Sequence, residues 1–423
     1  MNVVATLRGL SVDGRIRTPV AWSLYDFANT IFSFAVVSNA IGLLLTQGLG
    51  DADGNLWLGI ASAVAVGLNA LVSPVLGKIS DRGGQRLPYL LFFTVLAIVP
   101  CALIPFPPLA LGILLYSIAN FSYQSALIYY DAMLPEVSTP HTRGRVSGFG
   151  NAVGYMGTIF VAVVLLVGGF SVEQRFVIAA VLFGLFAIPI FIVVKEPPAK
   201  GAIFRLADVP ESWNQIVATI REAREVPYLS RFLLGRFFYT DALNTVIVVM
   251  SVFAVRAVGF SDQETLFVLL LLTVVAVVTG FFWGWLSDRI GPKRTLMIVL
   301  GVWVVGLLLA GLLLTKPTFL VAGALLGSGL GGMQISDRVL MLRLSPPEKL
   351  GQFYGIYGLV GKASQLIGVP LFTLIVAVLY PRIGTPAYQV AIMSLLGTML
   401  VGVWLVRPVP DGWRGSGEPD PEE

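Results

Sequence analysis

Charged residues are scarce in this chain. Asp, Glu, Lys and Arg make up 12% of its 423 residues, whereas about 25% is usual in a soluble protein. Hydrophobic residues make up 56%, and the mean hydropathy is +0.83. This composition excludes an ordinary soluble domain and indicates an integral membrane protein.

Cysteine and histidine are almost missing. The single cysteine, Cys101, cannot form an intramolecular disulfide, so the redox compartment is not indicated. His141 lies in a polar segment between hydrophobic runs, where we expect a solvent-exposed side chain. The sequence shows no metal-ligand cluster, nucleophile–base pair or Walker motif. We therefore expect neither an enzyme nor an ATP-driven pump, and no cofactor or metal. The polar residues 1–18 also predict no cleavable signal peptide.

Long hydrophobic runs are abundant instead. A helix needs roughly 20 apolar residues to cross about 30 Å of hydrocarbon. Pro105, Pro107 and Pro108 divide the longest uncharged run into two helices, and an apolar segment interrupted by Arg236 and Asp241 adds another. About twelve transmembrane helices are predicted, because open strands leave backbone groups unsatisfied in lipid. The segments are 27–50, 54–77, 87–130 (two helices), 146–172, 176–194, 230–257, 265–287, 295–315, 317–336, 363–381 and 383–406.

The basic residues predict the orientation in the membrane. With both termini cytoplasmic, 21 Lys and Arg residues fall in the inner segments and four in the outer loops, namely Arg175, Arg256, Lys316 and Arg382. Such a bias is typical of cytoplasmic loops, so we expect a multi-pass membrane protein with both termini in the cytoplasm. No basic stripe interleaved with aromatic residues is present. The excess positive charge is expected to meet anionic membrane lipids, and no nucleic-acid partner is expected.

Two polar segments 207 residues apart (288 − 81) have nearly the same sequence. Residues 77–86 and 284–294 both contain Gly-x-x-x-Asp-Arg-x-Gly between hydrophobic runs. This duplicated loop resembles the one that joins helices 2 and 3 of major facilitator transporters, and its copy between helices 8 and 9. An anion is stabilised near a helix N-terminus, so we expect the aspartates to accept hydrogen bonds there or from arginines. We predict an inner gate held shut by Asp81, Arg82, Asp288, Arg289, Asp131, Asp337 and Arg338. The alternative is that these charges serve only topology and helix capping.

The repeat extends beyond these loops. Asp26-x-x-Asn29-Thr30 returns as Asp241-x-x-Asn244-Thr245, 215 residues later (241 − 26), and the segment at 138–148 returns at 345–355. Parallel six-helix repeats are the layout of the major facilitator fold. We predict an all-α membrane protein with six-helix halves at 1–194 and 230–407. A cytoplasmic linker with an amphipathic helix is expected at 195–229, and a disordered cytoplasmic tail at 408–423.

Charges inside the predicted spans mark the candidate site. Each charged residue inside a span raises the free energy of membrane insertion by at least about 2.5–3.5 kcal/mol. Positions i, i+3 and i+4 share a helix face, so each repeat presents a carboxylate, an amide and a hydroxyl together. These groups are expected to bind a polar substrate or a proton; sodium is the rival ion, and the alternative role is helix packing. The predicted residues are Asp26, Asn29, Thr30, Asp241, Asn244 and Thr245, with Tyr25 and Tyr239.

Two basic residues also fall within predicted spans. Arg236 does not share a helix face with Asp241, so it needs a partner on another helix, or it snorkels to the membrane surface. Lys362 and Arg236 are candidate contacts for an anionic group of the substrate.

Four strings resemble the "unknown major facilitator" family, which includes fungal vacuolar amino-acid effluxers linked to autophagy. They are Trp22–Thr30, Tyr130–Pro135, Arg143–Gly157 and Tyr239–Thr245. Asp131 and Ala242 depart from the family pattern. The resemblance implies a secondary transporter of an amino acid or another small polar solute in the plasma (inner) membrane. We expect a monomer, with H⁺ as its coupling ion. The alternative is a non-transporting receptor or assembly protein that reuses the fold.

Overall fold

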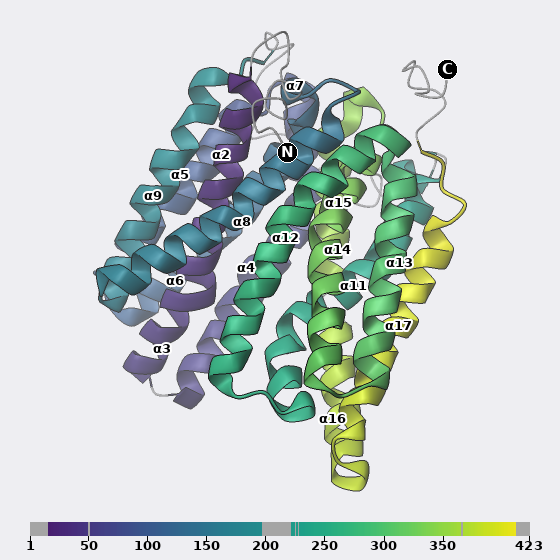
Figure 1. Ribbon diagram of the computed structural model, residues 1–423. Coiled ribbons are helices and arrows are strands. Elements are labelled where there is room, and N and C mark those ends of the chain that lie inside the picture. The colour runs from purple at the N-terminus through teal and green to yellow at the C-terminus, as the bar shows by residue number, and fades with distance from the viewer. Residues whose placement is uncertain are drawn as a thin grey trace. The chain divides into compact units, whose positions relative to one another are not determined.

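The computed structural model describes residues 16–49, 51–196, 221–224, 226, 228–364 and 367–411. Within these ranges the regular structure is helical, and no strand is found. The chain forms two compact units (Figure 1). The first contains residues 1–219 together with 348–359, and the second contains 220–347 together with 360–423. A short segment from late in the chain therefore belongs to the first unit.

The first unit contains two groups of packed helices. The chain runs straight from α2 into a π-helix, η1, and then into α3. The helix α2 packs against α8 and α9, and α6 packs against α4 and α5. The helices are α2 (Arg17–Phe32), η1 (Ser33–Ala40), α3 (Ile41–Leu49), α4 (Asp51–Gly83), α5 (Leu87–Leu103), α6 (Leu109–Ala132), α7 (Leu134–Val137), α8 (Arg143–Gly168) and α9 (Val172–Val193).

The second unit has a similar order of helices. Figure 1 shows α13, α14 and α17 side by side, and α11 packs against α17 and α16. The helices are α11 (Leu229–Phe253), η3 (Ala254–Val258), α12 (Asp262–Ile290), α13 (Pro292–Leu312), α14 (Lys316–Leu344), α16 (Gly368–Ile383) and α17 (Pro386–Val406). Between α14 and α16 lie a short 3₁₀ turn, η4 (Pro347–Lys349), and α15 (Leu350–Ala363), which belongs partly to each unit.

The helices are long and apolar enough to cross a membrane. Among the described residues, ten helices meet that test, and a bent pair within α4 (Trp57–Ser73 and Val75–Asp81) adds an eleventh. The shorter α5 is also apolar. Large apolar side chains remain exposed along these helices, with Val167 79% and Ile192 72% exposed. Such surfaces are expected where lipid replaces water as the solvent.

The two hinge loops, residues 81–86 and 288–294, need their glycines for different reasons. Gly84 and Gly291 have φ angles of 66° and 87°, which L-residues with a side chain rarely adopt. Gly77 has an ordinary backbone, but a β-carbon there would collide with the carbonyl oxygen of Gly351. Both copies of the pattern thus contain a glycine that the turn requires, and the first copy also contains one that a close helix approach requires.

Parts of two predicted segments lie outside the described residues. The linker at 195–229 is described only at its ends, and the tail at 408–423 only as far as Asp411. The predicted amphipathic helix and the predicted disorder therefore stay predictions.

Candidate functional site

In the second unit, Asp241 caps the start of another helix. Its side chain is on α11, the residue is 1% exposed, and its Oδ1 accepts a hydrogen bond of 2.7 Å from the backbone N–H of Gly368, the first residue of α16. The other carboxylate oxygen, Oδ2, is buried and has no hydrogen-bond partner among the described residues. A carboxylate buried without a cation is costly, so this oxygen is a candidate for binding a proton or cation.

The other predicted polar residues of α11 lie beside Asp241. Asn244 donates from Nδ2 to the carbonyl of Gly361 on α15 at 3.5 Å. Thr245 is fully buried, and its hydroxyl has no partner within the described part of the chain. The structure therefore brings the predicted carboxylate, amide and hydroxyl together against α15 and α16.

A separate ion pair lies one to two turns earlier on α11. Arg236 donates from Nε to Oδ2 of Asp337 on α14 at 3.1 Å, and both side chains are at most 10% exposed. Tyr239 donates its hydroxyl to the same oxygen at 3.3 Å. Arg236 thus has its partner on another helix, and Asp337, predicted to belong to the gate, pairs with it.

In the first unit, Asp26 faces a glycine of α8. A β-carbon on Gly154 would lie 2.9 Å from Oδ2 of Asp26, so only glycine leaves room for the carboxylate. Thr30 donates its hydroxyl to the Gly154 carbonyl at 2.5 Å. Asn29 is buried, and its Oδ1 has no partner among the described residues. Asp26 and Thr30 therefore both lie against α8.

Tyr25 is part of an aromatic core. Its hydroxyl is 2.7 Å from Oγ1 of Thr94 on α5, and its ring stacks on Tyr130 at 5.4 Å between centroids. Tyr130 also stacks on Trp22 at 4.4 Å. These contacts assign Tyr25 a place in the packing of α2 against its neighbours, and its predicted role in binding stays a prediction.

The first hinge aspartate caps α15 within the first unit. Both carboxylate oxygens of Asp81 accept backbone N–H bonds of 2.8 Å, from Gly351 and Gln352. Arg86 lies between two acids: it is 3.4 Å from Asp81 and donates to Glu136 at 2.5 Å. The expected contact of Asp81 with a helix N-terminus is present, and its role as a gate stays a prediction.

The remaining predicted gate residues are distributed along several helices. Arg82 lies in the last turn of α4, Asp131 near the end of α6 and Arg338 on α14. Asp288 and Arg289 end α12, where the Arg289 guanidinium lies 5.2 Å from the Trp285 ring centre. Lys362 is half-buried in the last turn of α15.

Sequence reasoning missed a pair of capping acids. Glu196 accepts N–H bonds from Arg86 (2.6 Å) and Leu87 (2.9 Å) at the start of α5. In the other unit, Asp411 accepts one from Lys293 (2.7 Å) at the start of α13. Burial raises the pKa of both carboxyls above their ordinary values, although these backbone donors lower it. The two acids are 215 residues apart (411 − 196), the same interval as Asp26 and Asp241, and that interval could have revealed them.

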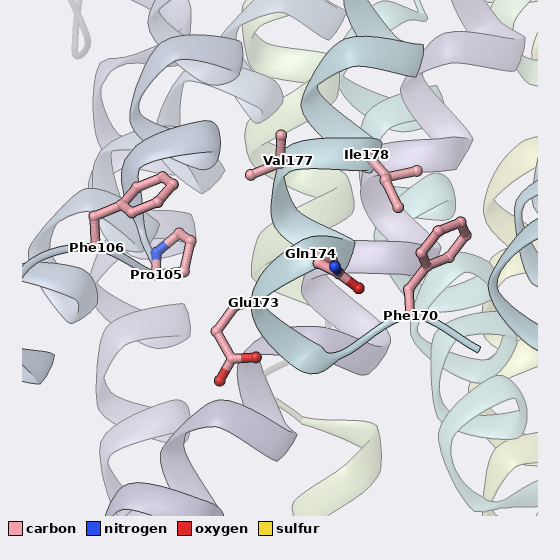
Figure 2. A pocket seen from close by; sticks show the side chains of 7 residues that line it. All are labelled: Pro105, Phe106, Phe170, Glu173, Gln174, Val177 and Ile178. Atoms are coloured by element: carbon pink, nitrogen blue, oxygen red, sulfur yellow. The ribbon is translucent and has the colours of Figure 1, made fainter. Parts of the chain in front are cut away.

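A cavity of about 480 Å³ lies elsewhere in the first unit (Figure 2). It is lined by Pro105, Phe106, Phe170, Glu173, Gln174, Val177 and Ile178. None of the predicted site residues lines it. Among the described residues, no three His, Cys, Asp or Glu side chains lie close enough to hold a metal ion.

The sequence matches a known family over most of its length. Residues 58–408 match the model of the family described as "Vacuole effluxer Atg22 like". The chain belongs to this family. The Atg22-like chain is similar to the uncharacterized MFS-type transporter YxiO of Bacillus subtilis, with 26% identity over 90% of this chain and 93% of that protein. It is also 25% identical to Autophagy-related protein 22 of Gibberella zeae, over 62% of this chain but only 44% of the fungal protein.

Solved structures confirm the predicted fold. The Atg22-like chain resembles the human organic anion transporter MFSD10, with TM-score 0.75, 16% identity, and coverage of 92% of this chain and 99% of that one. It also resembles the proton:xylose symporter XylE, with TM-score 0.70, 13% identity and coverage of 96% of both chains. At such identities the likeness shows the fold alone. The chain is a multi-pass membrane protein of the major facilitator superfamily.

Proposed function

We propose that this protein is a secondary transporter that moves a small polar solute, such as an amino acid, by alternating access coupled to protons. The observation that carries the proposal is the buried Oδ2 of Asp241, which has no hydrogen-bond partner among the described residues. The nearby acid Asp337 is neutralised by Arg236, whereas no ion pair is found for Asp241 in the described residues. A carboxyl in this setting avoids the cost of burial by binding a proton or a cation.

The membership of the family supports the transporter class, and the paired polar faces support a polar solute. Asp26 with Thr30 and Asp241 with Asn244 hold the same places in their repeats and lie against small residues that leave them room. We propose that the solute or the proton binds to the polar groups of these two faces. We further propose a monomer in the plasma (inner) membrane, with both termini cytoplasmic. This orientation follows from the basic residues.

Transport in proteoliposomes tests the coupling. Purified protein is first screened for solutes that raise its thermal stability, and a hit is then offered with an imposed pH or sodium gradient. We expect a pH gradient alone to drive accumulation. The Asp26→Asn and Asp241→Asn variants show which carboxyl is needed, since the one that carries the proton is expected to leave exchange without accumulation. Accumulation driven only by a sodium gradient would show that sodium, and not the proton, is the coupling ion. If no solute moves in either gradient, the proposed transport function is wrong.

Accessibility of single cysteines tests the orientation. With Cys101 replaced by alanine, cysteines at Asp53, Glu173 and Gln263 should react with an impermeant thiol reagent in intact cells, and one at Gly201 should not. Labelling of the cysteine at position 201 would contradict the proposed orientation, in which this position is cytoplasmic.

A further inference from the structure

The cavity of about 480 Å³ in the first unit lies at the ends of two packed helices, α5 and α9. Pro105 and Phe106 come from the turn after α5, and Val177 and Ile178 come from α9. Figure 2 shows Pro105 and Phe106 across from Val177 and Glu173. Most of the lining is apolar, so water in the cavity would find few hydrogen-bond partners. An apolar group is the better occupant, and the volume falls within the range of about 300–1,000 Å³ that is usual for ligand pockets.

The cavity is continuous with apolar surface that faces lipid. Phe106, on its rim, is 74% exposed. Exposed apolar side chains follow at helical spacing on both helices, Leu103 and Val99 on α5 and Val181 and Leu185 on α9. Contiguous exposed apolar surface of this kind marks membrane contacts or ligand grooves. An acyl chain that enters the cavity can therefore continue along α5 and α9 toward the middle of the membrane.

One end of the cavity carries a negative charge. The helix α9 has 22 residues, enough to cross about 30 Å of hydrocarbon, so its first turn lies near the level of the lipid headgroups. Glu173 is in that turn and is exposed. An exposed glutamate is ionised at neutral pH. Figure 2 shows its carboxylate pointing away from Val177 and Ile178, so the charge and the apolar walls are at different ends.

The charge of Glu173 has no counterion within the described part of the chain, where no ion pair joins it to a Lys or Arg side chain. Arg175, two residues later, instead donates to Oδ1 of Asn39 at 2.7 Å. The second unit offers a contrast, because Glu264, also in the exposed first turn of a helix, binds Lys316 at 2.8 Å. The carboxylate of Glu173 is thus available to a cation that the protein does not supply.

We propose that this cavity binds a phospholipid with a primary ammonium headgroup, such as phosphatidylethanolamine. One acyl chain fills the cavity and continues along the exposed faces of α5 and α9, and the ammonium donates an N–H bond to the carboxylate of Glu173. Such charge-assisted bonds are stronger than neutral ones. Phosphatidylglycerol is anionic and lacks this donor, and the ammonium of phosphatidylcholine has no N–H. The polar faces of α2 and α11 take no part, so this inference is independent of the proposed transport and its coupling.

Photo-cross-linking in vesicles tests the site. The full-length protein is placed in phosphatidylcholine vesicles with a trace of phosphatidylethanolamine that carries a diazirine on one acyl chain, and the labelled residues are mapped by mass spectrometry. We expect labelling of the residues that line the cavity. Unlabelled phosphatidylethanolamine should displace it about two- to fivefold better than phosphatidylglycerol does, the range expected for an exposed ion pair.

Two pairs of variants separate the headgroup from the acyl chain. Glu173→Gln should remove the preference between the two competing lipids, whereas Glu264→Gln, which removes an exposed acid in the second unit, should keep it. Val177→Trp should fill the cavity and reduce its labelling. Val278→Trp, at a position on α12 that is 64% exposed, should leave that labelling unchanged. Melting temperatures in detergent show whether each variant is folded, and Glu173 is exposed, so its variant should keep the wild-type value.

The outcomes that would overturn the proposal are specific. Equal displacement by phosphatidylethanolamine and phosphatidylglycerol in the wild type would show contact with an acyl chain and no recognition of the headgroup. A preference that persists in Glu173→Gln would show that this carboxylate does not bind the ammonium. Failure of solute transport in proteoliposomes, with the lipid preference and its dependence on Glu173 intact, would contradict the proposed function and leave the lipid site.

Discussion

Glu196 and Asp411 perform the same task in their own units. Each acid follows the last transmembrane helix of its half. Glu196 accepts backbone N–H bonds at the start of α5, and Asp411 accepts one at the start of α13. Both helices begin directly after a hinge loop. The position Gly291, two residues before Lys293, allows this approach, because a β-carbon there would collide with Asp411. Each hinge is thus fixed from one side by an acid that lies far along the chain.

The first prediction concerns the pH dependence of these caps. Burial raises the pKa of Glu196 above its ordinary value of 4.5. The folded protein therefore binds more protons than the unfolded chain between 4.5 and the raised pKa, and the contribution of Glu196 to stability falls as pH rises through that window. In Glu196→Gln, which cannot titrate, thermal unfolding in detergent should lose this part of the pH dependence. Asp411→Asn should behave in the same way from the ordinary value of 3.8.

Removing the caps entirely should cost stability at every pH. Glu196→Ala and Asp411→Ala each remove an acceptor for helix N–H groups, which is typically worth about 0.5–2 kcal/mol. Glu173, an acid on the exposed start of α9, supplies a control: Glu173→Ala should change stability less than either. Equal losses in all three variants would contradict the capping role.

The second prediction concerns the ion pair between Arg236 and Asp337. Removing one partner leaves a buried charge without its counterion, which typically costs about 3–5 kcal/mol. Arg236→Met and Asp337→Leu should therefore each lower the melting temperature strongly, and the double variant should recover most of the loss. Independent, additive losses would show that the two side chains are not coupled. A transport assay of the double variant then shows whether solute transport also requires this ion pair.

The fold was predictable because lipid restricts the alternatives. A run of about 20 apolar residues has one stable backbone form in a membrane, so the predicted segments correspond to helices such as α6 and α9. The repeats could be recognised for the same reason. Charged residues are rare in apolar runs, so the matching positions of Asp26 and Asp241 are easily identified. The long-range contacts were not readable. Arg236 and Asp337 are 101 residues apart, and no periodicity links a residue of one helix to its partner on another.

Local departures from helix regularity were also not predictable. The π-helix at Ser33–Ala40 occurs within an apolar run whose composition suits a regular α-helix. The hydrogen bond from the Gly368 N–H to Asp241 joins residues on two different helices, and no local pattern indicates it. Glu196 and Asp411 were assigned to a linker and a tail because polar residues after a span are usually solvated.

The third prediction concerns the first hinge. Asp81 accepts two charge-assisted bonds from the start of α15, each worth about 1.5–3 kcal/mol. The Asp81→Asn side chain has the same shape but no charge, so we expect reduced transport with normal membrane insertion. Single cysteines placed on the polar faces of α2 and α11 should become more accessible from the cytoplasm. Asp288→Asn and the double variant are tested beside it. Unchanged transport and accessibility in all three would leave the loops with a topological role only.

The fourth prediction concerns the close approach of α2 and α8. A β-carbon on Gly150 would lie 2.5 Å from the Trp22 ring, which is fully buried between Tyr130 and α8. Trp22 cannot yield, because its indole N–H donates to the Tyr130 carbonyl at 3.1 Å. Gly150→Ala should therefore destabilise the protein by about 1–3 kcal/mol, the usual cost of overpacking. Gly301→Ala on α13, where the added carbon meets nothing within 4 Å, should be neutral or slightly stabilising, because alanine favours helix. Thermal unfolding in detergent measures both, and equal melting temperatures for the two variants would show that α8 can move away from Trp22.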